Sequence, residues 1–554
     1  MTSSHPPPRA AVEGSVAAKS RIHSHGGSRS SGESESGAPP TAPPAVMLTG
    51  EGLTLNDYIS IAKHGAQVRI ADSALHQVRL ARACIDTRLA SGEIYYGINT
   101  GFGALSEVHI PAAKLTVLQL NLIRSHACGV GEPLDSESVR GILVLRIQTM
   151  IRGNSGVTEG TVRLMTEFLN QSIVPVVPSK GSVGACGDLA PLAHVALALI
   201  GEGEVFFRGE RMPSARALEH AGLRPIVPAA KEGLCLINGT QVMTAVGLLC
   251  CSEAHALLKT ADVCAAMTVD ATRGTSTAFR PEIQAVRPHP GQIESARNLM
   301  ALLADDAIRL SHSSCEKVQD PYSMRCAPQV HGAARNAWHH VLETLLREAN
   351  SSTDNPLVFP ETDEVLSGGN FHGEPVAMVL DYLAIAMSEI ASISERRIEK
   401  LVNPHMSGLP PFLARDSGLN SGFMIPHVVA AALVSENKVL SHPASVDSIP
   451  TSAEKEDHVS MGMTSALKLR TIIVNVAHVL SIEAIAGAQG LEFHKPLEGG
   501  VGVRAALTRV RTFSAPMDVD RSLSADIEAV ARDIRAGAFA KHVEEALPND
   551  TQLL

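Results

Sequence analysis

Three long stretches, poor in aromatic residues, constrain the fold more than any other feature of this chain. They cover residues 373–402, 426–440 and 461–491. Each is rich in Ala and Leu, with charges at intervals that would place them on one solvent-exposed face of a helix. Aromatic residues make up 3% of a chain that is 45% hydrophobic, so its core must be largely aliphatic, which suits closely packed helices. The sequence therefore predicts a mainly α-helical fold with a bundle of long helices.

Charge and cysteine usage narrow the classes of function. A formal net charge of -10 disfavours a nucleic-acid partner, because phosphate binding needs clustered Lys and Arg. Residues 1–9 contain no apolar leader, and the later apolar stretches are interrupted by Asp381, Glu389 and Glu395, so we expect neither secretion nor a membrane partner. Nine cysteines without CxxC or metal-ligand spacing indicate reduced thiols in a cytoplasmic protein.

Composition divides the chain into a tail and a globular region. Residues 1–46 are rich in Ser, Pro, Gly and His, which cannot bury enough apolar area to offset ordering entropy, so we expect a disordered tail. From Leu53 to Ala90 apolar residues recur at helical spacing, and the Gly-punctuated segment EIYYGINTGFGAL that follows predicts an irregular loop. Within residues 47–554 we expect a smaller N-terminal lobe over 47–240 and a helical bundle over 241–554.

The segment GSVGACGDLAPLAHVALALIGEG, residues 181–203, is the most informative motif. Its second half predicts a helix, with Asp188 able to cap the first turn and Pro191 tolerated there. Its first half is a turn dense in glycine, which alone fits either a helix-capping turn or a functional loop. A phosphate-binding loop is disfavoured, because the glycines run G-x-x-G-x-x-G, no Lys follows in a Walker pattern and no clear strand precedes them.

The stretch GSVGACGDLAPLAH is similar to the signature of the histidine and aromatic amino-acid ammonia-lyases, in which a tripeptide cyclises to a methylidene-imidazolone group. The resemblance implies that the amide nitrogen of Gly187 attacks the carbonyl of Ala185 and that elimination at Cys186 leaves a methylidene. Cys186 stands where a serine is usual, and a thiol leaving as sulfide gives the same group as a hydroxyl leaving as water. The self-made group would be the cofactor, with no diffusible cofactor and no metal required. The rival interpretation is an uncyclised, non-catalytic relative.

Family-like segments extend from Leu53 to Phe539. Tyr96, in YYGINTGFG, matches the family's catalytic tyrosine, the base that removes the β-proton. His126, in NLIRSHACGVGEPL, follows Ser125 as in the histidine lyases and would hydrogen-bond the substrate imidazole. Without the motifs, a buried tyrosine and a lone helical histidine would both be interpreted as structural.

Further motifs complete the site that the resemblance implies. Asn238 in LINGTQ would lie near the substrate amine, and Phe371 in SGGNFHGEPVA would form an apolar wall. The segment KVQDPYSMRCAPQVHG supplies Gln319 for substrate binding, Tyr322 to support the electrophile, and Arg325, whose planar guanidinium suits a substrate carboxylate. Glu456 in TSAEKEDHVSM would face the imidazole or amine, and Lys455 beside it stands where many relatives carry Gln.

These motifs imply elimination of ammonia from L-histidine to give trans-urocanate, the first step of histidine degradation. The family assembles as homotetramers whose sites combine residues from three subunits, so we expect a homotetramer with shared sites. An aromatic (Phe or Tyr) ammonia-lyase or a 2,3-aminomutase would carry the same catalytic motifs, but Ser125-His126 and Glu456 favour histidine. HExxH, GxSxG and P-loop motifs are absent from the sequence.

Overall fold

The N-terminal elements begin with a pair of short strands. The structure, a computed structural model, describes residues 43–312, 318–548 and 551–554, so most of the tail expected over 1–46 lies outside the described residues. Strands β1 (Val46–Leu48) and β2 (Val68–Ile70) pair in parallel. This pairing divides the apolar stretch from Leu53 to Ala90 into α1 (Leu55–Ala62) and α2 (Asp72–Ser91), and Thr54 caps α1 by accepting a hydrogen bond from Asp57.

Helices of up to 20 residues and short strands make up the chain as far as Thr240. The loop predicted over residues 93–105 is irregular and ends in a 3-10 turn, Gly103–Leu105. A three-residue strand, β5 (Pro178–Lys180), lies directly before the glycine-rich turn, so the expectation that no clear strand precedes it was wrong. Antiparallel pairing with β3 (Val130–Pro133) stabilises β5. The remaining elements of this part are α3 (Leu115–His126), β3 (Val130–Pro133), α4 (Ser136–Thr149), α5 (Glu159–Asn170), β4 (Val174–Pro175), β5 (Pro178–Lys180), α6 (Leu189–Leu199), β6 (Glu204–Phe207), β7 (Glu210–Pro213), α7 (Ser214–Ala221) and α8 (Glu232–Ile237).

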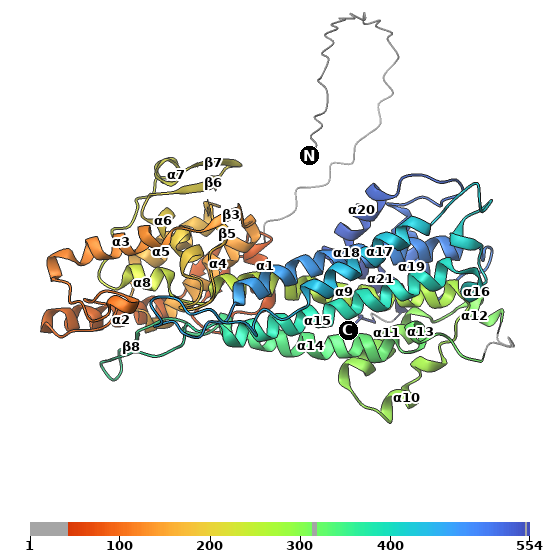
Figure 1. Ribbon diagram of the computed structural model, residues 1–554, viewed down its shortest axis with the longest axis horizontal. Helices are drawn as coiled ribbons and strands as arrows, with labels where there is room; N and C mark the ends of the chain where they lie inside the picture. Colours follow the sequence, from red (N-terminus) through yellow and green to blue (C-terminus); the bar gives the residue numbers. More distant parts are fainter. Residues whose placement is uncertain (1–42, 313–317, 549–550) are drawn as a thin grey trace, which may run out of the picture. The chain divides into compact units, whose positions relative to one another are not determined.

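Long helices run side by side in the rest of the chain (Figure 1), which confirms the mainly α-helical fold. The three stretches predicted as helices form α15 (Glu374–Val402), α17 (Met424–Leu440) and α18 (Gly462–Glu492), each within a few residues of the predicted bounds. The elements here are α9 (Gln241–Ala271), α10 (Pro281–Ala285), α11 (Pro290–Leu302), α12 (Ala307–Leu310), α13 (Tyr322–Arg325), α14 (Ala327–Ala349), β8 (Leu357–Phe359), β9 (Glu364–Leu366), α15 (Glu374–Val402), α16 (Pro404–Ser407), α17 (Met424–Leu440), α18 (Gly462–Glu492), α19 (Val501–Arg511), α20 (Ser524–Arg535) and α21 (Ala538–Glu544).

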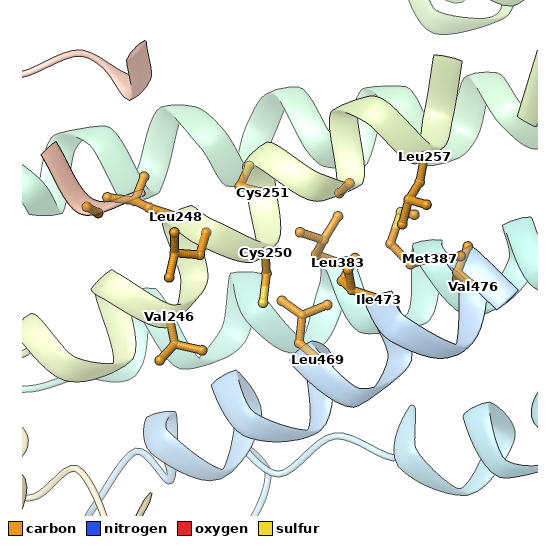
Figure 2. Packing of buried hydrophobic residues seen from close by; sticks show 14 of the residues in the cluster. Val246, Leu248, Cys250, Cys251, Leu257, Leu383, Met387, Leu469, Ile473 and Val476 are labelled. Carbon is orange, nitrogen blue, oxygen red and sulfur yellow. The ribbon is translucent and has the colours of Figure 1, made fainter. Parts of the chain in front are cut away.

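Helices α9, α15 and α18 form the centre of the core. Figure 2 shows side chains from all three meeting, including Leu248 and Cys250 of α9, Leu383 of α15, and Leu469 and Ile473 of α18. These residues are at most 3% exposed. The absence of large aromatic side chains from this seam fits the aliphatic core that the composition predicts.

The same three helices are long and apolar enough to cross a membrane, judged by length and composition only. Of their most apolar windows, 78% of α9, 67% of α15 and 83% of α18 are buried inside the protein. The bundle contains buried ion pairs: Arg397 on α15 donates to Glu483 on α18, and Lys468 lies 2.5 Å from Asp381. Mutual packing of the helices therefore accounts for their apolar composition.

Candidate active site

A cavity of about 600 Å³ lies between the N-terminal elements and the loop before α18. Five side chains that the sequence singled out line it: Tyr96, His126, Cys186, Asn238 and Glu456. They come from a loop, the end of α3, the glycine-rich turn, the end of α8 and the 451–461 loop. Apolar walls are added by Phe102, Leu118, Leu122, Leu189, Leu234 and Ile237.

The glycine-rich turn is pressed against the backbone at the start of α9. Gly187 has a φ of +72°, and a Cβ added to it would lie 2.0 Å from the carbonyl oxygen of Gly239. The amide of Asp188 donates to that oxygen at 2.8 Å, and the amide of Gly239 donates to the carbonyl of Cys186 at 3.3 Å. Both the left-handed conformation and the close contact require glycine at position 187.

Asp188 occupies the predicted N-cap position of α6, but its side chain makes no capping hydrogen bond to that helix. Its buried carboxylate instead accepts hydrogen bonds from the amides of Val242 (3.1 Å) and Met243 (2.9 Å) in the first turn of α9, and from Ser182 Oγ (2.8 Å). Those amides have no partner inside their own helix, and the positive end of α9 attracts the carboxylate. Burial raises the pKa of Asp188 to about 6, although these donors act in the opposite direction. The carboxylate thus fastens the turn to α9.

Cys186 and Glu456 are in direct contact inside the cavity. The thiol donates to Glu456 Oε1 at 3.1 Å, while Thr451 Oγ1 donates to Glu456 Oε2 at 2.7 Å. Burial, and then the nearby Glu456 charge, raise the pKa of the Cys186 thiol far above its ordinary value. The sulfur is therefore a protonated thiol, and Glu456 is held from both sides.

Tyr96 presents its hydroxyl to the backbone of the same loop. Its oxygen accepts a hydrogen bond from the amide of Gly103 at 3.4 Å. Burial raises the pKa of Tyr96, the Gly103 amide lowers it, and Cys186 and Glu456 raise it further. The Gly103 amide is the contact that favours the phenolate form expected of a base.

His126 is held in one tautomer. Its Nδ1 lies 2.8 Å from the carbonyl oxygen of Leu122 and 3.0 Å from Ser125 Oγ. A carbonyl oxygen only accepts, so Nδ1 carries the proton, and Nε2 becomes the acceptor. The cavity thus contains an imidazole nitrogen suited to an N–H donor of a ligand.

Asn238 brings a second acceptor. The side chain is 3% exposed, and its Oδ1 is buried without a hydrogen-bond partner among the described residues. Arg146 holds the backbone here by donating to the Asn238 carbonyl (2.7 Å) and to Gln241 Oε1 (2.8 Å). A buried, unpaired acceptor costs about 1–3 kcal/mol, so Oδ1 favours a ligand donor such as an ammonium group.

Four other predicted residues lie outside this cavity. Gln319 and Arg325 line a separate cavity of about 570 Å³, and Arg325 donates to the Asp320 carbonyl (3.0 Å) while stacking 4.5 Å from the ring of Tyr322. Tyr322 is 71% exposed, and half-buried Phe371 stands just before α15. Within one chain these residues therefore do not join Tyr96 and Cys186.

Several cavity residues escaped the sequence analysis. Asn121 lines the cavity on α3, together with Leu118, Leu122 and Ser125, at helical i, i+3, i+4 and i+7 positions. That periodicity, counted back from Ser125, is a signal that could have identified Asn121. Ser452 also lines the cavity, but it belongs to an irregular loop whose sequence has no comparable periodicity. Lys455 is exposed and lies outside the lining.

The fold and the cavity define a helical-bundle enzyme with phenol, imidazole, thiol, carboxamide and carboxylate groups around one small-molecule site. The family profile described as "Aromatic amino acid lyase" matches residues 53–512. The chain belongs to this family and is a carbon–nitrogen lyase.

Individual relatives agree with the family match. The chain is 54% identical to a histidine ammonia-lyase of Anaeromyxobacter dehalogenans (strain 2CP-C) over 503 residues, covering 89% of this chain and 99% of the relative. The crystal structure of histidine ammonia-lyase from Trypanosoma cruzi is similar with a TM-score of 0.85 and 44% identity, over 92% of this chain and 96% of that one. Tyrosine aminomutase from Streptomyces globisporus is similar with a TM-score of 0.87 and 34% identity, over 92% and 100%.

Proposed function

We propose that this protein catalyses the histidine ammonia-lyase reaction, the elimination of ammonia from L-histidine to give trans-urocanate. The observation that carries the proposal is the single cavity in which Tyr96, His126, Cys186, Asn238 and Glu456 meet. The relatives of higher identity support histidine as the substrate, since they are histidine ammonia-lyases.

The turn fits a methylidene-imidazolone formed from Ala185, Cys186 and Gly187. Closure joins the Gly187 nitrogen to the Ala185 carbonyl carbon with loss of water, and cleavage of the Cys186 Cβ–S bond with loss of the Cα proton releases hydrogen sulfide. The close approach of Gly187 to Gly239, where a Cβ has no room, supports such a bent backbone. When formed, the group supplies an electrophile that turns the substrate amine into a better leaving group.

The remaining side chains bind the substrate and move its proton. His126 Nε2 accepts the imidazole N–H, because Nδ1 is committed to Leu122. Asn238 Oδ1 accepts from the substrate amine, and Glu456, fixed by Thr451, attracts the positive charge of the amine or imidazole. Tyr96 takes the β-proton at its phenolic oxygen beside the Gly103 amide.

We further propose that the protein is a cytoplasmic homotetramer with shared sites. Exposed Tyr322, together with Arg325, Gln319 and Phe371, would enter the cavity of a neighbouring subunit, where Arg325 would bind the substrate carboxylate. The eight described cysteines are free thiols, which supports a reducing compartment.

A second candidate is an aminomutase or an aromatic amino-acid lyase, favoured by the high structural similarity to tyrosine aminomutase. Either enzyme would have to recognise a phenyl or phenol ring, whereas a histidine lyase recognises an imidazole ring. An acceptor nitrogen on His126 and the Glu456 carboxylate suit the N–H groups of an imidazole better than a phenyl ring.

The test is the ultraviolet absorbance and ammonia release of the purified protein with L-histidine, L-phenylalanine or L-tyrosine. We expect urocanate from histidine only, and none from the matched Cys186→Ala variant. Conjugated product from phenylalanine or tyrosine alone would overturn the substrate. A β-amino acid product would establish the aminomutase instead.

A further inference from the structure

A second, smaller cavity of about 210 Å³ shares no lining residue with the catalytic one. It lies where the end of α1 and the middle of α9 meet the connection between α20 and α21. Its charged lining residues are Lys63, Lys259, Arg535, Lys541 and Glu544, joined by His64 and His255. Segments far apart in the sequence thus bring four cations to one hollow.

The cations exceed the carboxylates that face them. Lys259 lies 2.8 Å from Glu544, and Arg535 lies 2.8 Å from Glu253, which does not line the cavity. Lys63 and Lys541 have no carboxylate partner among the described residues. Two uncompensated positive charges in one hollow stand out in a chain whose net charge is -10.

His255 lines the same cavity as a neutral imidazole. Burial, followed by the charges of Lys259, Arg335 and His339, lowers its pKa to about 4. The ring stacks on Trp338 with centroids 4.6 Å apart. A neutral, fixed imidazole beside the lysines adds a hydrogen-bonding group without adding charge.

We propose that this cavity binds a small multivalent oxyanion, such as inorganic phosphate or a di- or tricarboxylate. Its volume equals roughly seven water molecules at ~30 Å³ each, which admits such an ion. Lysine ammonium groups bind phosphate and carboxylate oxygens as point charges. A bound oxyanion would tie the C-terminal helices α20 and α21 to α1 and α9. The inference is independent of the proposed lyase reaction.

The experiment is calorimetric titration of the full-length protein with inorganic phosphate and, separately, with citrate. We expect one ion per chain and weaker binding as sodium chloride is added. The double substitution Lys63→Gln with Lys541→Gln should weaken binding about ten-fold or more. The matched control, Lys114→Gln with Lys438→Gln, removes two exposed lysines outside the cavity and should leave affinity unchanged.

One further variant should change the oxyanion affinity in the opposite direction. Glu544→Gln keeps the side-chain shape and removes the one carboxylate of the lining, so it should tighten oxyanion binding. Tighter binding of phosphate than of citrate at the same lysines would assign the site to phosphate, and the reverse to polycarboxylates. The proposal is overturned if neither ion binds saturably, if both lysine pairs weaken binding equally, or if Glu544→Gln weakens it. Thermal unfolding without added ion verifies that each variant is folded.

Discussion

Cys186 determines, at the scale of single residues, whether the proposed electrophile forms. We expect Cys186→Ser to give the same prosthetic group as the wild type, because water replaces hydrogen sulfide as the leaving molecule. Gly187→Ala should block closure, since its Cβ would lie 2.0 Å from the Gly239 oxygen. The measurement is the mass of the peptide containing residues 185–187, in which closure removes one water and one hydrogen sulfide.

Cys186→Ala is the matched control, because it keeps the turn and removes the leaving group. Its peptide should show no loss of hydrogen sulfide, and its activity should fall about 10³-fold or more. An unmodified, reactive thiol in the wild-type peptide would contradict the prediction and support a non-catalytic relative.

The raised pKa of Tyr96 predicts how kcat/KM depends on pH. Burial holds its pKa above the ordinary value, so phenolate is the minority form at neutral pH. As pH rises towards that pKa the phenolate fraction grows about ten-fold per unit, and kcat/KM should rise with it. Tyr96→Phe should lower kcat about 10²–10⁴-fold and abolish this rise. A pH profile of the variant parallel to that of the wild type would exclude Tyr96 as the base.

At the scale of elements, the seam between α9, α15 and α18 should be the most sensitive part of the fold. Leu383 is fully buried there (Figure 2), and Leu383→Ala should lower the free energy of unfolding by about 2–5 kcal/mol through cavity formation. Met378→Ala on the same helix is the control, since Met378 is 59% exposed and its loss should cost far less. Denaturant unfolding of both variants tests this difference; equal losses would contradict it.

Elements differ in how far the sequence could predict them. Helices α15, α17 and α18 were predictable because long periodic segments encode their own structure locally. Strand β2 was not, since three residues become a strand only by pairing with β1. The site divides in the same way: motifs identified Tyr96, His126 and Cys186, whereas the bonds of Asp188 to α9 depend on tertiary packing that no local pattern encodes.

At the scale of the whole molecule, the separation of Arg325 from the catalytic cavity predicts complementation between chains. Cys186→Ala and Arg325→Ala should each be nearly inactive alone. Co-expressed at equal levels, they should recover about a quarter of wild-type activity if each site takes these residues from different subunits. The assay is urocanate formation by the mixed protein. No recovery would mean that one chain supplies both residues.

The central packing of α9 against α18 also has a consequence for how the protein is made. Ala271, the last residue of α9, is synthesised long before Gly462, the first residue of α18. Until then the newly made α9 lacks the partner that covers much of its apolar surface, and exposed surface of this kind promotes aggregation. The nascent chain should therefore depend on chaperones most strongly while the segment between these two helices emerges from the ribosome.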